Sequence, residues 1–443
     1  MLGIISTAIL ASFHAVSPGL VRAEQESAPS TIPEPRSRVF GSALAPTVDI
    51  DGDGVPDLLV SDVCANTNGP RSGRVWAISC KTSQPLWFID GKEEKLEFGS
   101  RITVLGPGKH DSRPSQAGIM NLTGAIQWCD SKDGHMSRVQ PIKSASLEGG
   151  RKGLLECPSW DCSADYNDDG MPDVVIAEVV KSSPNGARAV VRVLSGLDGR
   201  DLSKPWAGEN RSYEYMRAYS CPDVDGDGVP EIIVLGVRRD KDSSEVAVVS
   251  GRSGAIVTTQ ELGTGLGGTI GVCAVIRGEK GQIVLATSSN AADGKGGVGA
   301  GSPGVELVDV RAHDVLRILR PPDAYAENME RDGTDVFGSR MIAINDIDGD
   351  GWDDLCVSQP DAMHGMGAAF TYSGRSGKLI WTLFYGEEMW SLGYALCQVS
   401  DLDGDGVADL AVSACTPNTV GFGGQVMCVS GKTGAELRRI RVK

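Results

Sequence analysis

The sequence predicts an all-β fold, and within that class a seven-bladed β-propeller of four-stranded antiparallel blades with calcium-binding loops. The first observation is an acidic motif, Asp-x-Asp/Asn-x-Asp-Gly-x-x-Asp/Glu, that occurs five times, each time directly before a short apolar run. The second is a tight turn, Ser-Gly-x-x-Gly, which occurs in clear or weakened form seven times. The third is spacing, since the motifs starting at Asp165 and Asp223 lie 58 residues apart and those at Asp346 and Asp401 lie 55 apart. Repeats of this length, built from short strands between turns, are typical of propeller blades.

Each acidic motif is a candidate calcium loop. Side chains at positions 1, 3, 5 and 9 of so short a loop must point towards one centre, and the carbonyl at position 7 can supply another oxygen. Several hard oxygen ligands on a flexible loop are what Ca²⁺ prefers, whereas Mg²⁺ requires a tighter octahedron. We therefore predict five structural calcium sites, the weakest in blade 3, where an amide replaces one carboxylate. The predicted ligands are Asp49, Asp51, Asp53, Val55 and Asp57; Asp165, Asn167, Asp169, Met171 and Asp173; Asp223, Asp225, Asp227, Val229 and Glu231; Asp346, Asp348, Asp350, Trp352 and Asp354; and Asp401, Asp403, Asp405, Val407 and Asp409.

Two other structures produce acidic motifs of this kind. An acidic surface turn uses the same residue types, but five copies with one internal spacing disfavour it. An EF-hand needs a bidentate Glu at position 12 and a helix on each side. Position 12 is apolar in every copy here, and the residues around it are β-branched strand formers. These residues are Val60, Ile176, Val234, Val357 and Val412.

Each blade should be a four-stranded meander. In blade 1 the strands are expected over 43–48, 58–63, 73–79 and 86–89. The two long intervals between acidic motifs predict blades 2 and 5, whose loops at 106–110 and 277–281 lack the carboxylates, so no metal is expected there. Residues 437–442 can form the outermost strand of blade 7, which closes the ring without strand exchange. Pairing of Val39 with blade 7 is the alternative.

The openings of several repeats carry a further motif, Phe-Gly-Ser, at residues 40–42, 98–100 and 337–339. Together with the acidic loop and the closing Ser-Gly turn, it resembles the FG-GAP repeat of integrin α-subunits and their bacterial relatives, over about residues 39–443. The resemblance implies a seven-bladed β-propeller with Ca²⁺ in the loop between the first two strands of a blade. The sequence departs from the family where Gly-Ala-Pro should follow the second strand, because Val60-Ser-Asp-Val and Val357-Ser-Gln-Pro stand there instead.

The N-terminus is expected to lie outside the propeller. Residues 1–23 resemble a secretory signal peptide, with an apolar stretch and a small-residue cleavage site, although the positively charged start is absent. Residues 24–38 are rich in Ser, Pro and Glu and are expected to form a disordered lead. This organisation predicts a secreted, periplasmic or cell-surface protein, and no other stretch is apolar enough to span a membrane.

Charge and cysteine content limit the function further. The formal net charge is −16, and five Ca²⁺ ions would offset ten of those charges. This charge argues against a nucleic-acid partner, whose binding requires clustered Lys and Arg. The eleven cysteines include three pairs that could bridge, namely Cys157 with Cys162, Cys415 with Cys428, and Cys64 with Cys80.

These features favour a monomeric protein-interaction or adhesion module rather than an enzyme, with no catalytic residue assigned. The partner, a protein or a glycan, is expected on the face opposite the calcium loops. Long irregular loops there carry Tyr215, Tyr325, Tyr385 and Trp390, beside Glu387 and Glu388. Alternatively, these aromatic residues fold back over the core.

Other functions remain open. The chain could be a carbohydrate-binding, lectin-like propeller. It could also be a quinoprotein-type enzyme, an idea prompted by Trp87 and Trp381 after their turns, or a polysaccharide-cleaving enzyme that uses its paired carboxylates.

Overall fold

The computed structural model describes residues 20–21, 30–32 and 39–442, apart from several internal segments. These segments are 107–114, 123–124, 141–158, 184–185, 203–205, 208–212, 239–242, 263–272, 290–303, 313, 327–336, 387–388 and 416–422.

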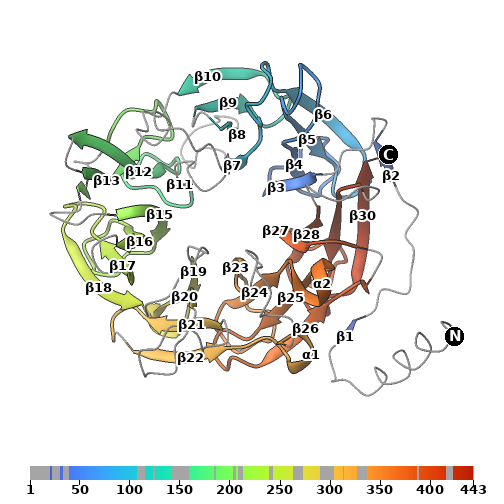
Figure 1. Cartoon of the computed structure of the whole chain (residues 1–443). Coiled ribbons are helices and arrows are strands. Elements are labelled where there is room, and N and C mark those ends of the chain that lie inside the picture. Colours follow the sequence, from blue (N-terminus) through green and yellow to red (C-terminus); the bar gives the residue numbers. More distant parts are fainter. Residues whose placement is uncertain are drawn as a thin grey trace, which may run out of the picture.

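The described strands form seven separate sheets that follow one another around a ring (Figure 1). Each sheet holds four antiparallel strands that are consecutive in the sequence. The first four blades are β3 (Phe40–Pro46), β4 (Leu58–Asp62), β5 (Arg74–Ile78) and β6 (Pro85–Asp90); β7 (Arg101–Leu105), β8 (Gln116–Met120), β9 (Ile126–Asp130) and β10 (Met136–Gln140); β11 (Ser159–Asp161), β12 (Val174–Ser183), β13 (Gly186–Leu194) and β14 (Trp206–Ala207); and β15 (Tyr213–Cys221), β16 (Glu231–Arg238), β17 (Ser243–Val249) and β18 (Ile256–Leu262).

The remaining three blades complete the ring. They are β19 (Cys273–Arg277), β20 (Ile283–Ser289), β21 (Gly304–Asp309) and β22 (Val315–Leu319); β23 (Arg340–Ile344), β24 (Asp354–Gln359), β25 (Ala368–Tyr372) and β26 (Leu379–Leu383); and β27 (Leu392–Val399), β28 (Asp409–Ala414), β29 (Gln425–Val429) and β30 (Glu436–Val442). The described helices are short: η3 (Glu279–Gly281), α1 (Asp323–Ala326) and α2 (Ala362–Gly365). The prediction of an all-β propeller with four-stranded antiparallel blades is confirmed.

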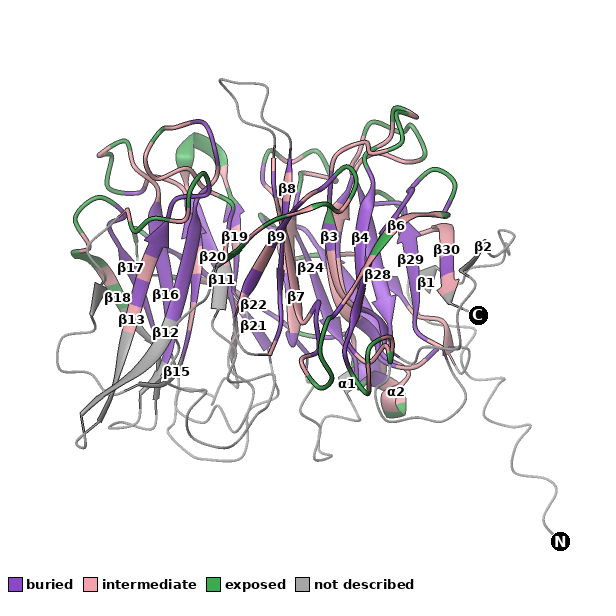
Figure 2. Ribbon diagram, turned by 90° about the horizontal axis from the view of Figure 1, so that it is seen from above, coloured by how far each residue is buried: buried purple, intermediate pink, exposed green. Residues whose placement is uncertain are grey.

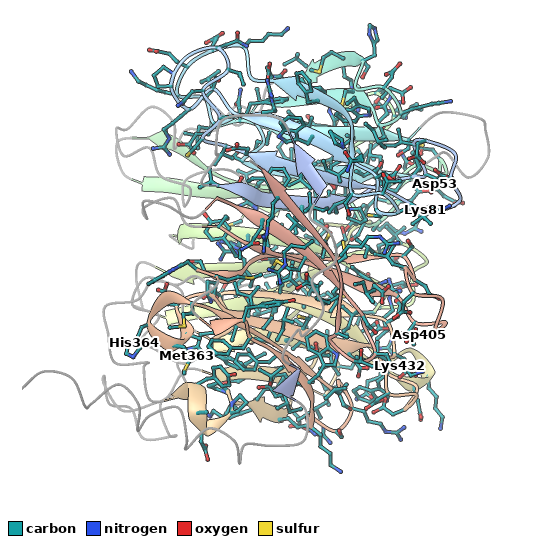
Figure 3. The ribbon with its side chains drawn as sticks, turned by 90° about the vertical axis from the view of Figure 1, so that its right-hand side faces the viewer. Asp53, Lys81, Met363, His364, Asp405 and Lys432 are labelled. Carbon is teal, nitrogen blue, oxygen red and sulfur yellow. The ribbon has the colours of Figure 1, made fainter. Side chains whose placement is uncertain are left out.

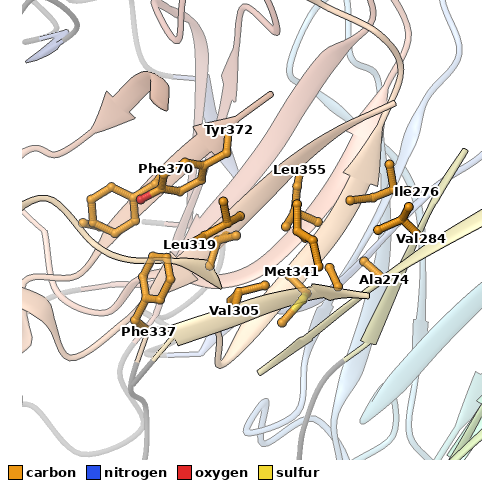
Figure 4. Close-up of a cluster of buried hydrophobic side chains, with 14 of the residues drawn as sticks. Ala274, Ile276, Val284, Val305, Leu319, Phe337, Met341, Leu355, Phe370 and Tyr372 are labelled. Carbon is orange, nitrogen blue, oxygen red and sulfur yellow. The ribbon is translucent and has the colours of Figure 1, made fainter. Parts of the chain in front are cut away.

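The hydrophobic core consists of layers between neighbouring blades. Middle strands such as β4, β5, β24 and β28 are buried along their whole length, because each faces a blade on both sides (Figure 2). Between blades 5 and 6, for example, Ile276 and Val305 pack with Phe337 and Phe370 (Figure 4). The apolar runs after the acidic motifs are therefore buried strands, as predicted.

The Phe-Gly opening is explained by the same packing. Phe40 is fully buried between blades 1 and 7. Gly41 has a φ of +94°, and a Cβ on it would lie 2.8 Å from the Cβ of Ser413 in β28. A side chain at this position would be strained and would push two blades apart, so glycine is required.

All four antiparallel strands of blade 7 come from the C-terminal end of the chain. β30 is the outermost of these four and pairs with β29, as expected from residues 437–442. β3 begins at Phe40 and pairs with β4 of blade 1. The alternative pairing of Val39 with blade 7 is not observed, and the ring closes by side-chain packing between blades 1 and 7.

Two short strands precede the propeller. β1 (Leu20–Val21) pairs in parallel with β26, and β2 (Ser30–Ile32) pairs in parallel with β30. The expectation of a disordered lead is therefore corrected for Ser30–Ile32, because the outer edge of a blade offers unpaired backbone groups that a passing chain can satisfy. The rest of the predicted signal peptide and lead lies outside the described residues.

The tryptophans that suggested a quinoprotein connect neighbouring blades. Trp381 of β26 donates its indole N–H to the Gly431 carbonyl in the turn of blade 7, at 2.8 Å. Trp87 of β6 donates in the same way to Ser131 in the turn of blade 2, at 3.1 Å. Their position after the turns therefore has a structural explanation that needs no cofactor.

Candidate metal centres

The five acidic loops connect the first and second strands of blades 1, 3, 4, 6 and 7. Since every such connection leaves its blade at the same end, the loops lie on one rim of the ring. Figure 3 shows Asp53 and Asp405 at that rim, and Met363 and His364 of α2 at the opposite one.

The residue at position 1 organises the loop backbone. In blade 1, Asp49 accepts the N–H of Gly52 through Oδ1 at 2.7 Å and that of Gly54 through Oδ2 at 2.8 Å. These N–H groups lower the pKa of Asp49, the largest contribution coming from Gly54. The same two contacts recur at Asp223, Asp346 and Asp401. The loop is therefore wrapped around an ionised carboxylate.

The residue at position 9 connects the loop to the rest of its blade, and its side chain is buried in all five loops. In blade 6, Asp354 Oδ2 accepts the N–H of Ile347 in the loop at 2.8 Å, and Oδ1 accepts that of Gly374 in the Ser-Gly turn at 3.0 Å. Equivalent pairs of contacts are made by Asp57, Asp173 and Asp409.

Burial changes the protonation of this carboxyl. Desolvation raises the pKa of Asp57, Asp173 and Asp354 to about 6 and that of Glu231 to about 7, and it also raises the pKa of Asp409. Coulombic repulsion from neighbouring loop carboxylates acts in the same direction, whereas the backbone N–H groups oppose the shift.

Four of the five loops bring carboxylate oxygens within 4.8 Å of one another. The clusters are Asp49, Asp51 and Asp53; Asp223, Asp225, Asp227 and Glu231; Asp346, Asp348 and Asp354; and Asp401, Asp403 and Asp409. Asp57, Asp350 and Asp405 belong to these loops but not to the converging sets.

Blade 3 differs from the other four loops. The Nδ2 of Asn167 donates to Asp169 Oδ2 at 3.0 Å, so the amide satisfies an oxygen that would otherwise face the centre. Position 4 is Asp168 with a φ of +57°, where the other loops have glycine. Asp165 and Asp173 keep their positions, but no convergence of three carboxylates occurs among the described residues of this loop.

Among the carboxylates that the structure describes, two buried oxygens have no hydrogen-bond donor, namely Asp53 Oδ2 and Glu231 Oε1. Both belong to acidic loops in which other carboxylates converge. A buried carboxylate oxygen without a donor is costly, and a cation bound by its neighbours would compensate it. The residues present therefore fit a hard cation such as Ca²⁺.

A basic residue in the Ser-Gly turn also contacts the loop, a feature that the sequence reasoning missed. Lys81, Arg252 and Arg375 donate to the backbone carbonyl at position 5 of their own blade's loop, at 2.8, 2.9 and 2.8 Å. Figure 3 labels Lys432 and Asp405 at the corresponding places of blade 7. The signal was a Lys or Arg at the third position of the turn, and in blade 3 that position is Leu197.

Two residues at position 7 have roles besides the predicted carbonyl ligand. The Trp352 side chain is buried in the core between blades 5 and 6, and that of Met171 in the core between blades 2 and 3. Val55 packs partly against the core of blades 1 and 7. Val229 and Val407 remain predicted carbonyl ligands.

Blade 5 has lost the acidic loop, as expected from residues 277–281. Its Glu279 instead forms an ion pair with Arg375 of blade 6 at 2.8 Å, beside the acidic loop of that blade. The corresponding loop of blade 2 lies largely outside the described residues.

The opposite rim carries α1 and α2, and its aromatic residues are less exposed than expected. Tyr325 of α1 is only 6% exposed and packs edge-on against Phe370 and Phe384. Tyr385 stacks with Arg439, and burial raises its pKa. The alternative that aromatic residues fold back over the core is therefore correct for Tyr325, whose ring fills a gap between blades.

Of the other residues expected on the binding face, the structure describes the side chain of Trp390. Trp390 is half-buried and lies beside Gly365 of α2. Tyr215 lies in β15, but its side chain is outside the described part, as are Glu387 and Glu388.

Among the described residues, no helix has the length and apolar character needed to cross a lipid bilayer. A family model for the FG-GAP repeat matches residues 40–78, which contain β3, the first acidic loop, β4 and β5. Over 98 residues the chain is 34% identical to integrin alpha-4 of Xenopus laevis, a match that covers 19% of this chain and 9% of that protein. The chain therefore contains an FG-GAP repeat within a β-propeller, and part of it is similar in sequence to an integrin α-subunit.

Proposed function

We propose that this chain is an extracellular or cell-surface interaction module whose propeller is stabilised by calcium. The observation that carries the calcium part is the convergence of carboxylate oxygens in four acidic loops. The similarity to integrin alpha-4 supports the extracellular setting and the interaction function.

The carboxylates of each cluster would hold the ion, together with the carbonyl at position 7. Bound Ca²⁺ would supply positive charge at the centre of the loop and relieve repulsion among the clustered carboxylates. In blade 3, Asn167 would have to turn its amide oxygen inwards, and this site should be the weakest.

Calcium is proposed to be structural rather than regulatory. Each loop joins the first two strands of a blade, and in blades 1, 3, 6 and 7 the residue at position 9 also hydrogen-bonds the loop to the turn after the third strand. An ion that binds only this folded arrangement stabilises the whole blade by mass action.

The partner, a protein or a glycan, is proposed to bind the rim that carries α1 and α2. The acidic loops are short and occupied with metal binding, whereas this rim has irregular connections on a rigid ring. Trp390 and the exposed His364 of α2 are the described side chains best placed to contact it. We propose binding and not catalysis, because the paired carboxylates of the acidic loops are engaged in the loop structure.

Calcium titration of chelator-treated protein tests the first part. Calorimetry should find four tight sites and a fifth, weaker one, and the melting temperature should rise with Ca²⁺ and much less with Mg²⁺. Two sites or fewer, or melting that ignores the chelator, would refute the proposal.

Partner capture tests the second part. A library of extracellular protein domains and a glycan array should be screened with wild-type protein and with the variant His364→Ala/Trp390→Ala. Lys432→Ala, on the calcium rim, is the matched control. Loss of binding only in Lys432→Ala would place the partner on the rim of the acidic loops and contradict the proposal. Binding to glycans alone would indicate a lectin-like propeller.

A further inference from the structure

Two buried thiols meet where the first and last blades join. Cys80 follows β5 in blade 1, and Cys428 lies in β29 of blade 7. Both side chains are fully buried, and the neighbouring Cys428 thiol together with burial raises the pKa of Cys80. They lie 348 residues apart in the chain. All ten described cysteines are thiols in this structure.

The alternation of side chains along the strands places both cysteines on facing sheets. In β29, Val426 belongs to the core layer between blades 1 and 7, and Cys428 lies two residues further along and so faces the same way. In blade 1, Trp76, Ile78 and Cys80 are spaced by two and all belong to that layer. The strand geometry therefore directs both cysteine side chains into the layer between blades 1 and 7.

The backbones beside the two thiols are also aligned. Arg438 of β30 lies directly opposite Cys428 in the sheet. Its Nε donates to the carbonyl of Lys81, the residue after Cys80, at 3.0 Å. This contact holds the turn of blade 1 at the height of Cys428.

A third thiol in the same layer, Cys397, cannot form a disulfide with Cys428. Cys397 of β27 and Cys428 both lie opposite Ala411 of β28, so they are separated by two strand spacings. That separation is about 9–10 Å, beyond the roughly 7 Å limit between Cα atoms for a disulfide. The variant Cys397→Ala is therefore a matched control for removal of Cys80 or Cys428, because it removes a buried thiol of the same layer.

Two of the three pairings considered from the sequence are excluded by strand register. Cys428 lies opposite Ala411, whereas Cys415 follows Ala414, whose partner is Gln425. In blade 1, Asp62 lies opposite Arg74 and Leu58 opposite Ile78, so Cys64 and Cys80 lie at opposite ends of the strand pair. Cys157 is outside the described residues.

We propose that Cys80 and Cys428 form a disulfide that covalently closes the propeller ring. In the reaction, one thiolate attacks a small-molecule disulfide of the glutathione class, and the other thiolate then displaces the second thiol from the mixed disulfide. The two cysteines lose two protons and two electrons, and the donor disulfide is reduced to two thiols. Because thiols buried in the finished core react slowly, the mixed disulfide forms before blades 1 and 7 have packed, and the bond between the two cysteines forms as the blades come together.

The proposal depends on the proposed function only in requiring an oxidising compartment, where disulfides persist. Its test is therefore made with purified full-length chain. The reduced, unfolded protein is refolded in Ca²⁺ with a mixture of oxidised and reduced glutathione, and peptides are then mapped without reduction after alkylation in denaturant. A peptide pair linked through Cys80 and Cys428 is expected.

Variants show whether the bond stabilises the ring. Addition of a thiol reductant should lower the melting temperature of the refolded wild type by about 5 °C. Cys80→Ala and Cys428→Ala should each lose this sensitivity, and Cys397→Ala should keep it. Each variant is compared with itself with and without reductant, so the cost of the smaller side chain cancels.

Two results would overturn the proposal. The first is full alkylation of both Cys80 and Cys428 after oxidative refolding to a protein with native, calcium-dependent melting. The second is reductant sensitivity that persists in both Cys80→Ala and Cys428→Ala. If neither variant folds, the peptide map of the wild type decides alone. Since the readout is independent of calcium and of any partner, its failure would leave the proposed function standing.

Discussion

The buried carboxylate of Asp354 accepts the backbone N–H of Gly374 at 3.0 Å, across 20 residues of sequence. Its second oxygen accepts the N–H of Ile347 inside the acidic loop at 2.8 Å. The loop and the Ser-Gly turn of a blade are therefore one hydrogen-bonded unit. Residues at position 9 therefore stabilise the fold with or without a metal, whereas the exposed residues at position 3 are expected to contribute to stability only by binding the metal.

Asp354→Ala and Asp348→Ala should separate these two roles. Asp354→Ala leaves two backbone N–H groups without an acceptor and should lower the free energy of unfolding by about 2–4 kcal/mol, even in chelator. Asp348→Ala should cost up to about 3 kcal/mol in excess Ca²⁺ and little in chelator. Chemical denaturation with and without Ca²⁺ measures both. Equal effects in the two conditions for Asp348→Ala would contradict a metal role.

The metal-free protein should become less stable as pH rises through the range 4 to 7. Burial raises the pKa of Asp57, Asp173 and Asp354 to about 6 and that of Glu231 to about 7. The unfolded chain titrates these groups near pH 4, so the folded state holds more protons in this window. The stability that the raised pKa values contribute is present below about pH 4 and is lost as pH rises through 6 to 7.

The melting temperature in chelator should therefore fall by roughly 5–10 °C between pH 5 and pH 7.5. In saturating Ca²⁺ the trend should reverse, because the ion binds the ionised carboxylates and competes with protons. Calorimetric scans at both pH values test this prediction. A metal-free protein that melts at the same temperature at both would show that these carboxyls are ionised in the folded state.

Asn167→Asp should strengthen the site in blade 3. It replaces an amide that donates to Asp169 with a fourth carboxylate, and calcium affinity depends on ligand charge. The dissociation constant of the weakest site should fall by about tenfold in a calorimetric titration. Asp168→Gly is the matched variant, since it relieves a φ of +57° without adding a ligand. It should stabilise the protein by about 1 kcal/mol regardless of Ca²⁺, and a change in affinity there would contradict the assignment.

Trp381→Phe should weaken the junction between blades 6 and 7. The indole N–H donates to Gly431 at 2.8 Å, and the ring is almost fully buried. Removing the donor leaves a buried carbonyl unsatisfied, and we expect a loss of about 2 kcal/mol in unfolding free energy. Trp87→Phe, at a more exposed junction, should cost about half as much. Denaturant titration of both variants tests this order, and equal or negligible costs would refute the junction role.

Much of the fold was determined by local sequence. Five acidic motifs, their glycines and the β-branched runs after them predict short strands between tight turns, because these residue types favour only a few backbone conformations. The spacing of the motifs then indicates blades, and the loops without carboxylates are visible as gaps. Asp49, Asp223, Asp346 and Asp401 could each be assigned to a carboxylate cluster because so short a loop keeps its acidic side chains close together.

Only the tertiary structure decided which distant residues meet. Tyr325 appears in the sequence as an exposed loop residue, but it fills a gap against Phe370, which lies 45 residues away. Cys428 could be matched with Cys415 nearby, but strand register separates these two, and the packing of blade 7 against blade 1 brings Cys428 close to Cys80. Closing a ring brings the first and last blades together through packing of whole sheets, and no local pattern encodes the partner of a side chain across that junction.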